Sequence, residues 1–149
     1  MVSGGVLCTL MSELGAAPHI RKKFRSAEAF ASWLGLCPDN RVSGGRILKA
    51  GTRKVTNRIA NILRMAANSL SRAHRRMGEY VRRFKGRLGK AEGIVAGAHK
   101  LARIIWAMIV SGQPYDETKA FATTPASQAR RLKHLQNQAQ ALNMKLVPV

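Results

Sequence analysis

Acidic residues are scarce in this chain of 149 residues, which has 7 Asp and Glu against 26 Lys and Arg and a formal net charge of +19. The acids are scattered, and no pair of them has the spacing that a two-metal nuclease requires. The four histidines are equally dispersed. We therefore expect no metal site in this chain and no cleavage of nucleic acid by metal-activated water.

Cysteine and long apolar runs are also nearly absent. Cys8 and Cys37 belong to no CxxC motif and have no histidine pair nearby, which is typical of small apolar residues in a reducing cytosol rather than of zinc ligands. The most apolar stretch, residues 101–110, is too short to span a bilayer and contains Arg103. The chain starts without the basic segment of a signal peptide. We expect a soluble, cytoplasmic protein without a membrane partner.

Positive charge is concentrated in residues 41–90, which hold 15 Lys and Arg and a single acid, Glu79. Such a field attracts polyanions, and its clustering is typical of proteins that bind nucleic acid. Two alternatives stay open. One is a well-solvated cationic protein. The other is a protein that lies on a membrane surface through a helix with one basic and one apolar face, for which residues 53–73 are the candidate.

Apolar residues recur at spacings of three and four along most of the chain, which predicts an all-α fold. Residue types that precede or begin helices occur at Ser26, Thr52, Thr124 and Pro125. A residue type that ends helices occurs at Gly35. Predicted helices cover residues 6–14, 26–35, 52–73, 79–87, 92–110 and 124–142. Residues 18–25 are predicted to be a basic connector, and residues 37–51 a loop or a short hairpin, because they contain Pro, Asp, Asn and three glycines.

This pattern predicts a compact helical domain over residues 1–114, with a Gly-rich basic loop between its helices. Residues 115–149 are predicted to form a linker and a C-terminal tail helix. That helix either packs on the domain or pairs with another chain.

The basic loop, "RVSGGRILKAGTRK" at residues 41–54, allows three interpretations. It is an ordinary polar surface loop, a cradle for a nucleic-acid phosphate, or the position of a nucleophilic serine, Ser43. Gly44 and Gly45 let the backbone approach a phosphate closely, and the predicted helix start downstream offers free N–H groups. Arg41, Arg46, Lys49 and Arg53 could stabilise a developing alkoxide and the phosphate oxygens. The residue pattern alone leaves all three open.

Residues 24–70, "FRSAEAFASWLGLCPDNRVSGGRILKAGTRKVTNRIANILRMAANSL", resemble the C-terminal domain of DEDD-type insertion-sequence transposases, the bridge-RNA-guided recombinases. The family pattern F-x-S-x-x-x-F-x-x-W-L-G-L-x-P starts at Phe24 and is followed here by Ser43, Gly44 and Gly45, and by a basic G-x-x-K/R segment at residues 51–54. The likeness continues through residues 78–115. The sequence departs from the family at Val42, where a second serine is common, and residues 1–15 match only the second half of a helix-hairpin-helix motif.

The resemblance implies a DNA-binding transposase fragment that acts in DNA transposition and recombination, with Ser43 as the nucleophile on a DNA phosphodiester. The residues it implies for binding nucleic acid are Arg41, Gly44, Gly45, Arg46, Lys49, Arg53, Lys54 and Arg58. Mg²⁺ would belong to a RuvC-like domain that this sequence does not include, so no cofactor is expected here.

The partners implied are DNA, a structured guide RNA, a RuvC-like N-terminal transposase chain, and further copies of the chain in a homo-oligomer on DNA. The alternative is a non-catalytic remnant that binds nucleic acid and lacks the metal-dependent domain.

Overall fold

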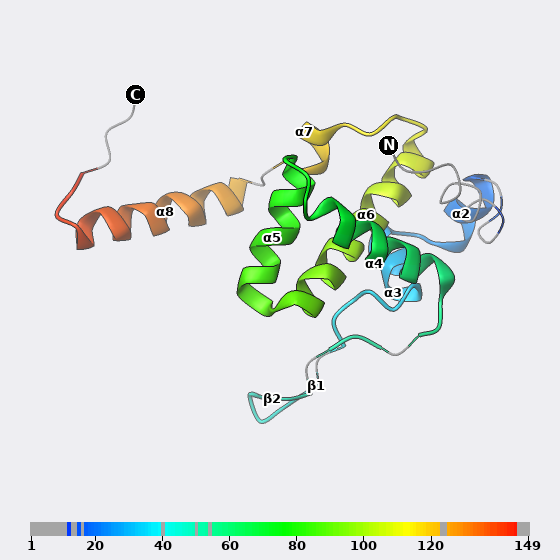
Figure 1. The fold of residues 1–149 in the computed structure, drawn as a ribbon, viewed down its shortest axis with the longest axis horizontal. Helices are drawn as coiled ribbons and strands as arrows, with labels where there is room; N and C mark the ends of the chain where they lie inside the picture. Colours follow the sequence, from blue (N-terminus) through cyan, green and yellow to red (C-terminus); the bar gives the residue numbers. More distant parts are fainter. Residues whose placement is uncertain are drawn as a thin grey trace. The chain divides into compact units, whose positions relative to one another are not determined.

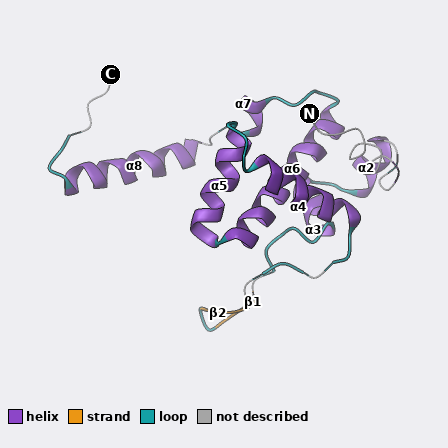
Figure 2. Ribbon diagram, in the orientation of Figure 1, coloured by secondary structure: helices purple, strands orange, loops and turns teal. Residues whose placement is uncertain are grey.

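The computed structural model describes residues 12, 15, 17–39, 41–49, 51–53, 55–122 and 125–145. These residues form seven helices and one two-stranded hairpin (Figures 1 and 2). The predicted all-α class is confirmed, and the hairpin lies in the segment for which a loop or hairpin was expected. The chain divides into two units, residues 1–115 and 116–149, which are described separately. The elements are α2 (Ala17–Lys23), α3 (Ala27–Trp33), β1 (Arg41–Ser43), β2 (Arg46–Lys49), α4 (Arg58–Leu70), α5 (Arg76–Leu88), α6 (Lys90–Ser111), α7 (Glu117–Ala120) and α8 (Pro125–Ala141).

Helix α6 is the centre of the first unit, where α2, α3, α4 and α5 all pack against it. Its small residues Gly93, Gly97, Ala98 and Ala102 are buried, so that neighbouring helices approach its backbone closely. The apolar run at residues 101–110 is part of this 22-residue helix, which is long and apolar enough by length and composition to cross a membrane. One such helix is weak evidence for a membrane span, because core helices pass the same test; four helices pack against α6, and 22% of its most apolar window is buried.

The hydrophobic core joins α2, α3, α4 and α6. Phe30, Leu34, Leu36, Ile59 and Leu63 are each no more than 1% exposed. The sequence expectations for α3 are confirmed. The Ser26 hydroxyl accepts a hydrogen bond from the Ala29 N–H at 3.1 Å, and Gly35 follows the helix with a φ of +68°. These two residues fix the length of the short helix that supplies Phe30 to the core.

Residues 18–25, predicted to be a connector, are mostly helical instead, because α2 spans Ala17–Lys23. Ile20 and Phe24 lie four residues apart and are both buried, whereas the basic residues between them are exposed. Lys23 extends its ammonium group over the Trp33 ring, 5.1 Å from the ring centre. Burial of one apolar edge and a cation–π contact therefore give this basic segment the tertiary support that its composition did not indicate.

Helix α4 begins later than predicted. Its N-cap is Asn57 and not Thr52, because the Asn57 Oδ1 accepts hydrogen bonds from the N–H groups of Ile59 and Ala60 at 2.9 and 3.3 Å. Thr52 instead forms an isolated antiparallel bridge with Pro38. The chain returning from the hairpin therefore stays non-helical up to Asn57, since asparagine is a strong N-cap residue at the point where the helix can begin to bury its apolar side.

Helices α5 and α6 confirm the predicted helices at 79–87 and 92–110, and pack closely through glycine. A Cβ at Gly93 would lie 2.5 Å from the backbone N of Lys85, and one at Gly97 would lie 2.7 Å from a Val81 methyl group. Because glycine has no Cβ, it allows α5 and α6 to pack this closely at both positions. Helix α6 ends before Gly112, whose φ is +66°.

The second unit contains α7 and α8. Helix α7 lies in the segment predicted to be a linker, and the Asp116 carboxylate caps it by accepting from the Thr118 and Lys119 N–H groups. Helix α8 starts at Pro125 as predicted, and its Leu132 and Leu135 side chains are exposed. The predicted cap Thr124, and nearly all of the predicted helix at 6–14, lie outside the described residues. Pairing of α8 with another chain stays a prediction.

Candidate nucleic-acid interface

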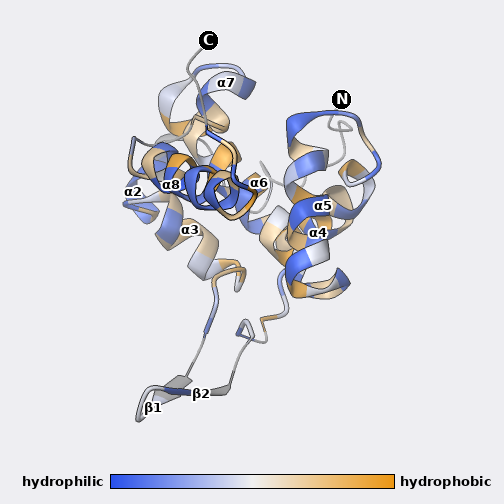
Figure 3. Ribbon diagram, turned by 90° about the vertical axis from the view of Figure 1, so that its left-hand side faces the viewer, coloured by the Kyte–Doolittle hydropathy of each residue, from blue (hydrophilic) through white to orange (hydrophobic). Residues whose placement is uncertain are grey.

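The candidate interface is the hairpin formed by β1 and β2, which extends away from the other elements of the first unit, α2 to α6, in Figure 1; Figure 3 shows the same fold by hydropathy. The strands pair antiparallel, with Ser43 opposite Arg46 and Arg41 opposite Lys49. The turn residues Gly44 and Gly45 have φ values of +55° and +75°. Positive φ at both central residues is the requirement of a type I′ turn, which matches the twist of a two-residue hairpin. The Ser-Gly-Gly-Arg sequence therefore closes the hairpin tip.

Ser43 is exposed at this tip. No atom lies within 4 Å of the position that a Cβ would take at Gly44 or Gly45, so the surface beside the serine is open. Arg46, also exposed, is the cross-strand partner of Ser43, and directly opposite residues project from the same face of an antiparallel pair. The hairpin register therefore places Ser43 and Arg46 on the same accessible face of the tip, beside the two glycines.

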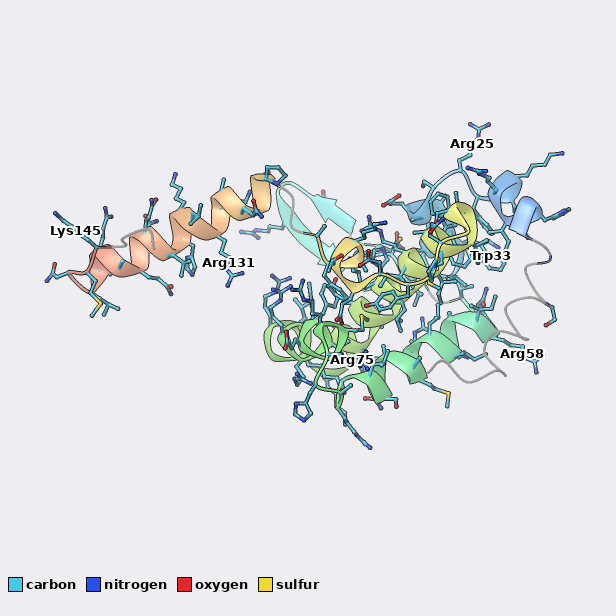
Figure 4. All side chains as sticks on the ribbon, turned by 90° about the horizontal axis from the view of Figure 1, so that it is seen from above. Arg25, Trp33, Arg58, Arg75, Arg131 and Lys145 are labelled. Carbon is cyan, nitrogen blue, oxygen red and sulfur yellow. The ribbon has the colours of Figure 1, made fainter. Side chains whose placement is uncertain are left out.

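The other residues implied in binding lie farther along the hairpin or on its return. Arg41 and Lys49 pair in the ladder, although their side chains and the whole of Lys54 lie outside the described residues. Arg53 is exposed, and its Nη2 donates to the Ser32 hydroxyl at 2.6 Å and to the Ser32 carbonyl at 3.0 Å. Arg53 thus anchors the returning chain to α3. Arg58, the first residue of α4, is exposed and points away from the ribbon in Figure 4.

The expectation of free helix N–H groups beside the loop is wrong. Helix α4 starts at Arg58, and Asn57 already satisfies the N–H groups of Ile59 and Ala60. A phosphate at the hairpin would therefore have to be held by the tip backbone and by arginine and lysine, with little contribution from a helix N-terminus.

Comparison with known proteins identifies the family. The family model described as "Transposase IS116/IS110/IS902 family" matches residues 3–82, more than half of the chain. The chain belongs to this transposase family. A protein of Sinorhizobium fredii (strain NBRC 101917 / NGR234), y4pF/y4sB, whose name classes it provisionally as a transposase, is 30% identical over 109 residues. The match covers 69% of this chain and 28% of the relative, so the chain spans less than a third of that protein's length. No solved structure matches the chain.

In this transposase-family chain, a second basic surface lies on α5 and was not among the implied binding residues. The rings of Tyr80 and Phe84 come from positions four residues apart on α5, and their centres are 4.7 Å apart. The guanidinium carbon of Arg83 lies 5.8 Å from each ring centre, and that of Arg87 lies 4.8 Å from the Phe84 ring. The spacing of residues 80, 83, 84 and 87 placed them on one helix face, which is the signal that could have identified this surface.

Two other cations of α5 have internal partners. The Arg82 Nη1 donates to the carbonyl groups of Ser71 and Ala73, both at 2.9 Å, and the Lys85 Nζ donates to the Ser71 hydroxyl at 2.8 Å and to Asn68 Oδ1 at 3.2 Å. Ser71 is the C-cap of α4, so these cations satisfy groups around the end of that helix. The cations of residues 41–90 therefore divide into those that stabilise the fold and those that face solvent.

Among the residues that the structure describes, cysteine and the acidic and imidazole groups form no further candidate site. Cys37 is half-buried, burial raises the pKa of its thiol, and its Sγ lies 3.9 Å from the Glu28 carbonyl oxygen. Cys8 lies outside the described residues. Among the described residues, no group of three or more His, Cys, Asp or Glu could hold a metal ion.

Proposed function

We propose that this chain is the nucleic-acid-binding, serine-containing part of a transposase, corresponding to the C-terminal domain of the bridge-RNA-guided recombinases. The observation that carries the proposal is the exposed Ser43 at a glycine turn, with Arg46 opposite it in the hairpin. Membership of the transposase family supports DNA as the substrate. A structured guide RNA, a RuvC-like partner chain and assembly of several copies on DNA belong to the same proposal.

The chemistry assigned to Ser43 is transesterification. Its Oγ attacks the phosphorus of a DNA phosphodiester, a P–Oγ bond forms, and one P–O bond to a deoxyribose breaks. The hydroxyl proton passes to a base or to water, and the released deoxyribose oxygen takes up a proton. Arg46 would stabilise charge on the non-bridging phosphate oxygens, which is the role that cations play in phosphoryl transfer. The step as written balances in atoms and in charge with these groups alone.

The first prediction is that Ser43→Ala abolishes covalent attachment of the chain to DNA. The chain is incubated with a RuvC-like partner and labelled insertion-sequence DNA, and adducts are measured on a denaturing gel. Ser69→Ala is the matched control, because Ser69 is an exposed serine on α4, outside the hairpin. Adducts that persist in the Ser43→Ala variant would reject Ser43 as the nucleophile.

The second prediction concerns binding to duplex DNA. Arg46→Gln is expected to weaken binding across all sequences and to lower the log–log salt slope by about 0.9, the value for one lost phosphate contact. Fluorescence anisotropy at several salt concentrations measures both effects. Arg131→Gln in α8 removes the same charge from another exposed position. An equal loss in both variants would show that overall charge, and not the hairpin, determines binding.

A binding-only role is the second candidate function. The observation that favours it is that no side chain among the residues that the structure describes is hydrogen-bonded to the Ser43 hydroxyl, so none of them is a base positioned on it. This role predicts salt-sensitive DNA binding by the wild-type chain together with no covalent adduct when the RuvC-like partner is present. The adduct experiment therefore separates the two functions.

A further inference from the structure

The solvent-facing side of α5 carries what we call the aromatic stripe, defined as Tyr80, Arg83, Phe84 and Arg87. Both rings are half-buried, so each is held by the fold and retains an accessible part. Both arginines are exposed, and their guanidinium groups lie over the rings at 4.8 to 5.8 Å. Rings and planar cations therefore alternate along one helix face.

The arginines of the stripe differ from the other cations of α5. Arg82 and Lys85 donate to groups around the end of α4, and so stabilise the helix pair. Among the described residues, no ion pair and no hydrogen bond involves the guanidinium of Arg83 or Arg87. Cation–π contacts hold them without using their N–H donors, which stay available for an anionic ligand.

The charge around the stripe is positive. Arg103 of α6 lies close enough to Tyr80 to act on its phenol, together with Arg83 and Arg87. Burial nevertheless raises the pKa of Tyr80, so the phenol stays protonated and uncharged. Arg103 is paired with Glu28 at 2.9 Å, and Glu79 is the single acid of α5. One acid on α5 against the exposed arginines leaves a surface suited to a polyanion.

We propose that the aromatic stripe is a second nucleic-acid site, and that its ligand is a single strand whose unpaired bases stack on the ring and guanidinium surfaces. The phosphates of that strand would accept hydrogen bonds from Arg83 and Arg87. The site shares no residue with the hairpin and does not depend on the chemistry of Ser43.

A single strand fits this surface better than a duplex does. Bases stacked inside a duplex present only their edges in the grooves, so a protein aromatic face cannot reach their π surfaces. Unpaired bases stack on Tyr, Phe and Arg planes, with little dependence on sequence. A duplex would use the arginines as point charges only, and the alternation with aromatic rings would then serve no purpose in binding.

The test compares an oligothymidylate with an abasic oligomer of equal length, which has the same phosphates and no bases. We expect the wild-type chain to bind the oligothymidylate about tenfold more tightly, the effect of one stacked base at the lower part of its usual range. Arg83→Lys with Arg87→Lys keeps the charge and removes the planar groups. In this double variant the ratio is expected to fall while staying above one, because the rings of Tyr80 and Phe84 remain, and duplex binding is expected to be unchanged.

Phe84→Leu is the second variant, and Arg130→Lys with Arg131→Lys in α8 is the matched control, for which the wild-type ratio is expected. Because Arg83 and Arg87 are exposed, their replacement by lysine keeps the fold and decides the test even if Phe84→Leu lowers stability.

Oligouridylate distinguishes RNA from DNA as the source of the strand, and preference for either one supports the site. A wild-type ratio near one, or a ratio unchanged in the double variant, would overturn the proposal. Ser43→Ala and Arg46→Gln are expected to leave the ratio unchanged, so failure here is separable from failure of the hairpin proposal.

Discussion

Replacing Phe30 by Ala is expected to lower the free energy of unfolding by about 3–5 kcal/mol, the usual cost of removing a buried phenylalanine ring. Phe30 is fully buried, and its ring packs against Phe24 and Trp33, with ring centres 5.2 and 6.3 Å away. Its loss would leave a cavity where α3 meets the core. Since domains of this size are stable by only about 5–15 kcal/mol, much of the margin would disappear.

Urea unfolding followed by circular dichroism measures this effect. Met65→Ala is the control, because Met65 lies on α4 and is 73% exposed, so its truncation is expected to change stability by less than about 0.5 kcal/mol. If Phe30→Ala cost no more than Met65→Ala, the packing of α3 described here would be wrong.

Replacing Gly93 by Ala is expected to cost about 3 kcal/mol, the upper part of the range for overpacking. The new Cβ would lie 2.5 and 2.6 Å from the backbone N and Cα of Lys85. Backbone atoms cannot move aside as the end of a flexible side chain can, so α5 and α6 would have to separate. The separation would also disturb Val81, which is fully buried.

Gly86→Ala is the matched control for this prediction. Gly86 lies within α5, is exposed, and has no atom within 4 Å of the position of a Cβ. The same substitution is therefore expected to stabilise the protein by about 0.5–1 kcal/mol, because alanine loses less backbone entropy than glycine in a helix. Thermal unfolding of both variants gives the comparison, and shifts in the same direction would contradict close packing of α5 on α6.

The elements predicted correctly are those whose signals are local. Ser26 and Gly35 delimit α3, Pro125 begins α8, and the hairpin with its turn at Gly44 and Gly45 lies in residues 37–51, where a loop or a short hairpin was expected. Each depends on residues within a few positions of one another, such as a side-chain oxygen three residues before an N–H group or two adjacent residues that adopt positive φ. The transposase family was also indicated by the pattern of residues 24–70, and the family match confirms it.

The elements predicted wrongly depend on distant partners. Both Thr52 and Asn57 have suitable cap side chains, and the choice of Asn57 follows from the path of the chain as it returns from the hairpin, where Thr52 bridges to Pro38. Helix α2 was missed because its helical support comes from burial of Ile20 and Phe24 and from the contact of Lys23 with Trp33. Basic composition alone gives no indication of such contacts.

By itself the sequence determined the helical class, a loop or short hairpin in residues 37–51 and the strongly cationic middle of the chain, since composition and short-range spacing suffice for these. Only the tertiary structure decided which cations remain available to a ligand. Arg53, Arg82 and Lys85 donate to groups on other elements, whereas Arg46 faces solvent and Arg83 and Arg87 lie over aromatic rings. The physical reason is that a guanidinium or ammonium group has the same charge in every context, and its hydrogen-bond partners are fixed by how the helices pack.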